Sequence, residues 1–368
     1  MTKEQKDNLF VLIKSLSKSE KRQFKLYVGR LGVNEDSKFL MLFNILEKLP
    51  FYDESTILKK GVVKKQQLSN LKAHLYKQIL ISLRLNPSHQ NIRIQIREQL
   101  DFATILYHKG LYKQSLKILD KAKSLAIANE EKNIAYEIVE LEKVIESQYI
   151  TRSISSRADE LTIQAKELSQ QNVLASKLSN LSLQLYGLFL KTGYVKNDKE
   201  NKRITKYFND RLPKYNINTL GFREKLWLYK AYLWYSFLTQ DFLACYKYAS
   251  KWVTLFYDHK DQIVLNPVFF LKGNHYLLES LFFLRHYEKF KTTLNDLETI
   301  TKESWFPLDD NVEGLAFLYV YNNKFNLHFI EGSFQEGLPM VQVVLDNLKK
   351  YQDRIDEHHV MVFYYKIA

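Results

Sequence analysis

The chain reads Gly110-Leu111-Tyr112 between two stretches of helically spaced apolar residues, and the same order of turn residue and aromatic residue returns three times. The further copies are Gln240-Asp241-Phe242, Arg285-His286-Tyr287 and Gly332-Ser333-Phe334. After each aromatic residue, side chains three, seven and ten positions later fall on one helical face, as Ser115, Leu119 and Ala122 do after Tyr112. A turn between two amphipathic helices that recurs along a chain predicts a stack of helical hairpins.

The amino-acid composition favours helices along the whole chain. It contains 11 Gly and 6 Pro in 368 residues, less than half of the usual shares of about 7% and 5%, which leaves few residues for the turns between strands. Aromatic residues make up 14% of the chain, enough for a packed interior and too many for a disordered segment. We therefore predict a folded, all-α protein.

Residues 1–90 read as a compact helical module. Ser17-Lys18-Ser19-Glu20 has the form of a capping box and predicts the start of a helix. Further on, a short helix over residues 53–60, a break at Gly61-Val62-Val63 and a long helix over residues 64–85 follow one another. A short helix, a tight break and a long helix are the outline of a helix-turn-helix.

The repeats begin after this module, so we predict two domains, residues 1–90 and 91–368. The predicted hairpins cover residues 92–128, 131–170, 173–212, 222–257, 268–300 and 313–350. The turns of the second and third hairpins are the least marked, and we place them near residues 151–156 and at Gly193-Tyr194.

The residues of the clearest turn resemble the tetratricopeptide repeat. In that family a Gly closes the first helix, an aromatic residue follows two positions later, and small, large and small residues follow at fixed distances. The matching residues are Gly110, Tyr112, Ser115, Leu119 and Ala122. The later turn aromatics are 45 and 47 residues apart, against 34 in the standard unit. Over about residues 92–368, the resemblance implies a right-handed solenoid of antiparallel helical hairpins that binds partners.

Basic residues gather in the first quarter of the chain. Residues 1–90 hold 17 Lys and Arg against 8 Asp and Glu, a net charge of +9, and the remaining residues add +4 to give +13. The stretch from Ser55 to Ile96 contains eight basic residues and no carboxylate. Such an uncompensated excess of positive charge points to a polyanion or an acidic protein as a partner.

Seven residues around the break before the long helix are of the types that contact phosphates and base edges. They are Lys59, Lys60, Lys64, Lys65, Gln67, Asn70 and Lys72. In a helix-turn-helix the start of the second helix meets the groove of the nucleic acid, so we predict that residues 55–97 bind DNA or RNA. Two alternatives stay open: the segment contacts an acidic protein or another part of this chain, or its lysines are solvated surface residues without a partner.

No catalytic or metal-binding pattern is present in the sequence. It lacks a nucleotide-binding glycine motif and the GxSxG, HExxH and CxxC patterns, and its nine histidines are dispersed. The single cysteine, Cys245, occupies a small-residue packing position, which predicts a buried thiol in a reducing compartment. With no apolar run of about 20 residues, we predict a soluble cytoplasmic protein without cofactor, metal or enzymatic activity.

Aromatic residues are dense between Trp227 and Phe256, where core packing accounts for most of the rings. Tyr229, Tyr235 and Tyr248 are the candidates for the inner groove of a solenoid, because an amphipathic ring can anchor a peptide.

The sequence thus favours a non-enzymatic adaptor that binds a protein or peptide partner in its groove and does not bind membranes. The alternative is a regulator that binds DNA or RNA through residues 55–97 and senses a partner through its repeats. The apolar pattern of residues 358–368 has the form of another first helix without its second helix, which predicts that the chain ends within a repeat.

Overall fold

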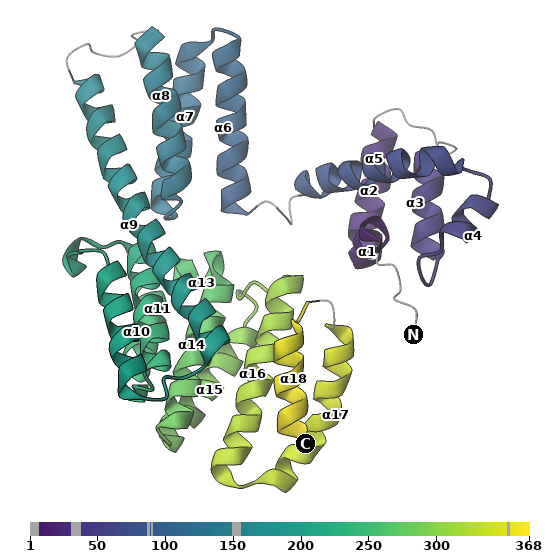
Figure 1. The fold of residues 1–368 in the computed structure, drawn as a ribbon. Coiled ribbons are helices and arrows are strands. Elements are labelled where there is room, and N and C mark those ends of the chain that lie inside the picture. Colours follow the sequence, from purple (N-terminus) through teal and green to yellow (C-terminus); the bar gives the residue numbers. More distant parts are fainter. Residues whose placement is uncertain (1–6, 31–37, 87–88, 90, 149–155, 352–353) are drawn as a thin grey trace. The chain divides into compact units, whose positions relative to one another are not determined.

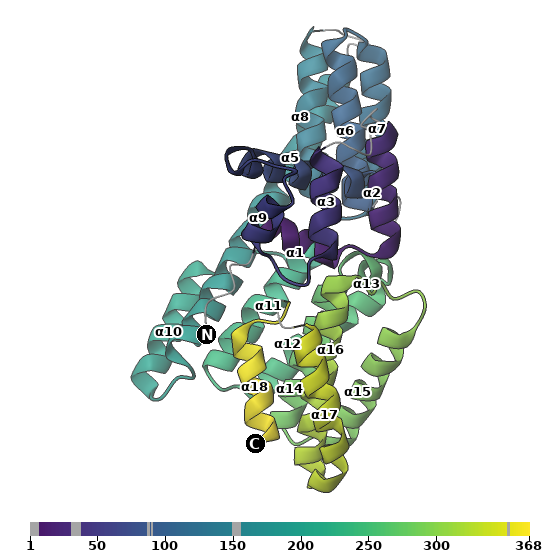
Figure 2. The same ribbon diagram turned by 90° about the vertical axis from the view of Figure 1, so that its right-hand side faces the viewer.

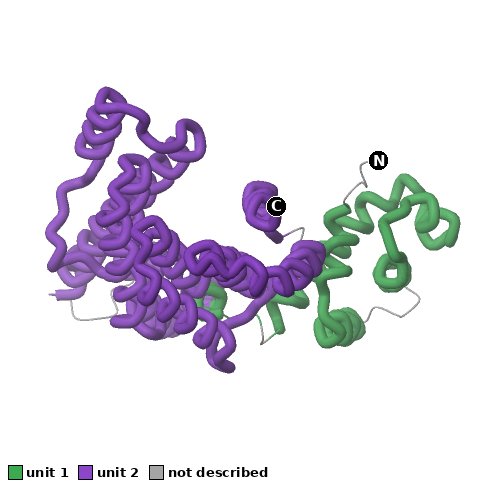
Figure 3. Tube along the Cα trace, turned by 90° about the horizontal axis from the view of Figure 1, so that it is seen from below, with its two compact units in different colours: residues 1–98 green, residues 99–368 purple. Residues whose placement is uncertain are grey.

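The computed structural model describes residues 7–30, 38–86, 89, 91–148, 156–351 and 354–368. It is all-α, as predicted, since these residues form helices and no strand (Figure 1). The chain forms two compact units, Met1–Glu98 and Gln99–Ala368 (Figure 3), whereas the sequence pattern changes near residue 90. No helix in the described ranges combines the length and the apolar character that crossing a membrane requires.

The first unit is built around a core that α1, α2, α3 and α5 share. Its helices are α1 (Asn8–Ser15), α2 (Lys18–Arg30), α3 (Lys38–Lys48), α4 (Glu54–Lys59) and α5 (Lys65–Arg84). The predicted capping box is confirmed: the Ser17 N–H donates to Glu20 Oε2 at 2.6 Å, and the Glu20 N–H donates to Ser17 Oγ at 3.2 Å. Phe24, Phe43 and Leu75 are buried where α2, α3 and α5 meet.

The second unit continues from α6, whose first turns belong to the first unit. Its helices are α6 (Ile92–His108), α7 (Tyr112–Ala128), α8 (Lys132–Gln148), α9 (Arg157–Thr192), α10 (Asp198–Arg211), the 3₁₀ helix η2 (Ile217–Thr219), α11 (Phe222–Leu238), α12 (Phe242–Asp258), α13 (Asp261–Leu265), α14 (Pro267–Phe283), α15 (Tyr287–Lys302), α16 (Asp310–Glu331), α17 (Phe334–Lys350) and α18 (Glu357–Ile367). Each helix packs against the next from α7 to α9 and from α10 to α17, and α14 also lies beside α16 (Figures 1 and 2).

Five turns of the second unit share one backbone geometry. Each contains a residue with a left-handed φ between 56° and 72°: Gly110, Glu130, Gln240, Arg285 and Gly332. In each turn the next N–H donates to the carbonyl oxygen five residues earlier, at 2.8–3.1 Å, and the following helix begins one residue later. This is the hydrogen bond of the Schellman motif. The weaker copies of the sequence pattern therefore form the same turn as the copies with Gly.

The predicted division between the second and third hairpins is wrong. α9 continues through residues 171 and 172 and is 36 residues long. Its first 30 residues contain no Gly or Pro, so no residue interrupts the helix. α9 packs against both α8 and α11 (Figure 1). This single helix therefore takes the place of two separate helices that the predicted hairpins contain. The predicted turn near residues 151–156 lies, apart from Ser156, outside the described residues.

The core of the second unit is rich in aromatic side chains. Trp252, Phe256, Phe270 and Phe290 are fully buried in it. Cys245 is buried as predicted, and burial raises the pKa of its thiol.

Gly273 of α14 and Gly187 of α9 both lie inside helices, and we expect the same substitution to change the stability in opposite directions. A Cβ at Gly273 would lie 2.9 Å from atoms of the buried Trp252 ring, whereas a Cβ at Gly187 would meet nothing within 4 Å. Overpacking a core costs about 1–3 kcal/mol, so Gly273→Ala should lower the Tm. Gly187→Ala should raise the Tm, because Gly inside a helix lowers the stability by about 0.5–1 kcal/mol relative to Ala. Thermal unfolding followed by circular dichroism measures both shifts, and shifts of equal sign would contradict this packing.

Candidate functional site

We call the connection between α4 and α5 the basic turn; its lysines are Lys59, Lys60, Lys64 and Lys65. Ile57 before the turn and Val63 within it are buried and anchor it to the core. Gly61 supplies the left-handed φ of 69° at which the chain reverses. All four lysine side chains are exposed, and none has an ion-pair partner among the residues described for this unit. The turn therefore presents uncompensated positive charge to solvent.

The start of α5 adds to this positive potential. Lys64 is the N-cap residue and makes no side-chain capping hydrogen bond, and the first turn of α5 contains no acidic residue. The exposed side chains of Gln67 and Asn70 follow one and two turns later. Peptide N–H groups at a helix N-terminus carry partial positive charge and stabilise anions such as phosphate. Six of the seven residues that the sequence nominated thus lie on one exposed segment.

Lys72 is the exception among these seven residues. Its ammonium group forms an ion pair with Asp7, donates to Tyr52 Oη at 2.8 Å and lies 4.7 Å from the centroid of that ring. Burial lowers the pKa of Lys72, but the hydrogen bonds to Asp7 and Tyr52 outweigh burial and raise it above its usual value. The charge of Lys72 is compensated inside the unit, where it connects α5 to the N-terminus of α1.

Tyr235, one of the three tyrosines predicted to anchor a partner, packs against α10. Its ring stacks on Phe208 with 4.3 Å between centroids, and its hydroxyl shares a hydrogen bond of 3.0 Å with Thr205. Both the face of the ring and the hydroxyl group are engaged within the unit.

Tyr229 and Tyr248 lie on α11 and α12 and are half-buried. Tyr248 stacks on Tyr232 at 4.5 Å, and the hydroxyl of Tyr232 shares a hydrogen bond of 3.1 Å with that of Tyr215. The hydroxyls of Tyr229 and Tyr248 have no protein partner in the described part of the second unit. Their rings pack as core residues do, while their polar ends remain available to water or to a ligand.

A further set of charged residues, which we call the polar strip, was not singled out from the sequence. It consists of Lys230 on α11, Lys272, His275 and Glu279 on α14, and Lys366 on α18. Its signal in the sequence is the spacing of three and four residues along α14, which places three polar side chains on one face of an apolar helix. Lys230 and Lys366 come from other helices, and no local pattern connects them to this face.

Lys230 and Lys272 are half-buried cations without an ion-pair partner among the described residues. The ammonium group of Lys230 lies 4.7 Å from the centroid of the Trp227 ring. Burial and then the charge of Lys272 lower the pKa of Lys230 to about 8. Burial also lowers the pKa of Lys272. An acidic ligand would oppose the effect of burial and raise both pKa values.

His275 is neutral and has a defined tautomer. The Asn323 side chain donates to its Nδ1 at 3.2 Å, so the proton of the ring lies on Nε2, which faces Glu279 Oε1 at 3.5 Å. Burial and then the charge of Lys366 lower the pKa of His275 to about 3. Burial raises the pKa of Glu279 to about 7, and Lys366 partly offsets this rise.

Lys366 attaches α18 to α16. Its ammonium group donates to Asn326 Oδ1 at 2.5 Å and to the Asn322 backbone oxygen at 3.3 Å. The strip therefore joins hydrogen-bonded polar groups on α14, α16 and α18 to the two unpaired lysines.

No protein-family model, curated protein or solved structure matches this chain.

Proposed function

We propose that the second unit is a right-handed solenoid of helical hairpins, similar to tetratricopeptide repeats, and that the chain is a non-enzymatic adaptor for a protein or peptide partner. The observation that supports this most is the five turns with one left-handed residue and one shared hydrogen bond. Seven helices around these turns are 17 residues long. Units of constant length and constant turn stack with a regular rotation and expose a continuous face, which such proteins use to bind partners.

The polar strip is the face where we place the partner. Burying a lysine without an ion-pair partner is costly; the charge of Asp356 offsets this only in part for Lys272, and an acidic side chain of a partner would pair with Lys230 and Lys272. The hydroxyls of Tyr229 on α11 and Tyr248 on α12, which have no partner in the described part of this unit, are proposed to supply hydrogen bonds to the same partner.

Exchange of the two lysines for glutamine tests this proposal. The immobilised full-length parent chain is expected to retain partner proteins. The variant Lys230→Gln/Lys272→Gln should not retain them, because the charges that attract the partner are absent. The matched control is Lys117→Gln/Lys121→Gln, which removes the same charge from exposed positions of α7 and should keep them. Quantitative mass spectrometry of the retained proteins is the measurement, with circular dichroism as the check on folding. Identical protein sets for both variants would exclude the polar strip.

The basic turn supports a second function, the binding of DNA or RNA by residues 55–97. Four exposed lysines without ion-pair partners lie beside a helix N-terminus without a side-chain cap. This arrangement suits phosphate groups, whose contacts give binding that weakens steeply with salt. A protein adaptor without this activity would show no such salt dependence towards a nucleic acid.

A further inference from the structure

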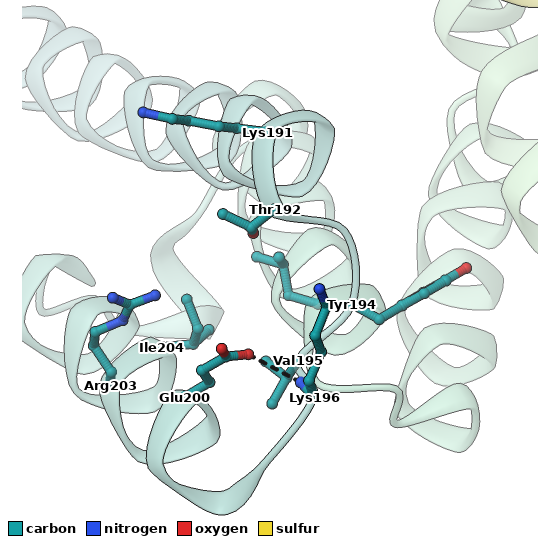
Figure 4. A pocket seen from close by; sticks show the side chains of 9 residues that line it. Lys191, Thr192, Tyr194, Val195, Lys196, Glu200, Arg203 and Ile204 are labelled. Carbon is teal, nitrogen blue, oxygen red and sulfur yellow. Dashed lines mark hydrogen bonds between the residues drawn. The ribbon is translucent and has the colours of Figure 1, made fainter.

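A pocket opens between the end of α9 and α10 (Figure 4). It has two adjoining parts of about 290 and 510 Å³, which share Lys191, Thr192, Arg203 and Ile204. Together the two parts have the size of small-molecule sites, roughly 300–1,000 Å³. None of the surfaces discussed above uses this pocket.

Hydrogen bonds hold both walls of the pocket in place. The Val195 N–H donates to the Leu238 oxygen at 2.9 Å, and the Gln240 side chain donates to the Val195 oxygen at 2.8 Å. On the opposite side, Tyr207 Oη donates to Gln184 Oε1 at 3.2 Å and links α10 to α9. The connection between the helices and the gap between their walls are thus fixed by the fold.

The wider part of the pocket has an apolar wall. Gly187, Leu188 and Ile204 contribute to this wall. Glycine is unfavourable inside a helix, and a Cβ at Gly187 would meet no atom within 4 Å. Gly187 is exposed, so no neighbouring group requires the glycine for close packing, and a larger side chain at this position has room to extend over the apolar wall.

Two exposed cations line both parts of the pocket. Lys191 lies on the α9 wall and Arg203 on the α10 wall, while the Tyr194 ring points away from both (Figure 4). Neither cation has an ion-pair partner among the residues described in this unit. The lining also contains one carboxylate, that of Glu200, whose Oε2 accepts a hydrogen bond of 3.0 Å from the Lys196 backbone N–H.

We propose that this pocket binds a small amphipathic anion. Its aromatic or alkyl body contacts Gly187, Leu188 and Ile204, and its carboxylate or phosphate group lies between Lys191 and Arg203. The planar guanidinium group matches either anion with two parallel hydrogen bonds. The inference is independent of the adaptor proposal, because a chain without any protein partner would still bind the anion.

Calorimetric titration of the full-length chain with four probes tests the chemistry of the ligand. Naphthyl phosphate and naphthoate carry both an apolar ring and an anion, inorganic phosphate lacks the ring, and naphthalenemethanol lacks the charge. At least one of the two aryl anions should bind about tenfold or more tighter than either half-ligand, since a charge-assisted hydrogen bond and an apolar contact act together. The stronger of the two identifies the anion. Absence of binding by both aryl anions, or equal binding of the neutral alcohol, would overturn the proposal.

Three variants locate the binding in this pocket. Gly187→Leu fills the wider part with a side chain that a helix tolerates well, and Lys191→Glu/Arg203→Glu reverses the charge of the walls. Each should weaken the binding of the aryl anion about tenfold or more. The matched control Lys199→Glu/Lys202→Glu makes the same charge change at exposed positions of α10 and should leave the affinity within about twofold of the parent. Binding that survives Gly187→Leu, or that both charge variants weaken equally, would place the anion outside the pocket; thermal unfolding confirms that each variant is folded.

Discussion

Reversal of the four lysines of the basic turn to Glu is expected to abolish the binding of the full-length chain to a mixed pool of DNA and RNA. Each phosphate contact contributes about 0.9 to the slope of log affinity against log salt concentration. Four such contacts give a slope of about −3.6, which lowers the affinity about 150-fold between 50 and 200 mM salt. The variant loses these contacts and gains repulsion, so its binding should disappear at the lower salt concentration. Filter binding or fluorescence anisotropy at several salt concentrations measures the slope.

Two further variants separate this site from general electrostatic attraction. The first variant carries Glu at four lysines that are exposed in or after α10: Lys199, Lys202, Lys206 and Lys214. It changes the net charge by the same amount and should preserve most of the binding. Lys72→Gln should lower the Tm because it leaves Asp7 unpaired, without any change in the salt slope. A parent chain that does not bind at low salt, or equal losses in the two fourfold variants, would contradict nucleic-acid binding through the basic turn.

The positions of most helices were predictable because their signals are local. The capping box at Ser17 and the turn at Gly110 each involve residues within one or two helical turns of each other, and both formed where the sequence placed them. Gln240 and Arg285 show that the flanking helices impose the turn, since both residues adopt the left-handed conformation at a cost of about 1–2 kcal/mol. Residues that are more restricted than Gly at this position are thus no evidence against a turn of this kind.

The features that the sequence did not reveal depend on contacts between distant residues. Lys72 looked like its basic neighbours, but its partner Asp7 lies 65 positions earlier in the chain. Lys230 and Lys366 join a strip whose other members lie on α14. The undivided α9 was missed for a different reason: an expected repeat length suggested a turn where no residue disfavours the helix. Where the helix propensity of the residues disagrees with an assumed repeat length, the propensity is the better guide to the helix.

A buried ion network connects three successive helices of the second unit. Lys123 on α7 lies 2.6 Å from Glu142 on α8, and Arg157 on α9 lies 3.2 Å from the other oxygen of the same carboxylate. The Glu142 side chain is 0% exposed, and those of Lys123 and Arg157 are 10% and 13% exposed. Burial raises the pKa of Glu142 although both cations oppose this rise. The loss of hydration therefore exceeds the attraction that the carboxylate gains from its partners.

Glu142→Ala is expected to destabilise the protein by about 3–5 kcal/mol, because it leaves Lys123 buried without its counter-charge and removes one of the carboxylates around Arg157, which keeps Glu160 at 3.2 Å. Glu140→Ala is the matched control: this residue of α8 is also 2.6 Å from a lysine, Lys143, but the side chains are 44% and 38% exposed, and such surface pairs contribute about 1 kcal/mol or less. The double variant Lys123→Met/Glu142→Leu should recover most of the stability, because it removes both charges together and fills their volume with apolar groups. Urea unfolding of the full-length chain, followed by circular dichroism, ranks the three variants. A loss for Glu142→Ala no larger than that for Glu140→Ala would mean that water reaches the carboxylate and that the network does not join α7, α8 and α9 in solution.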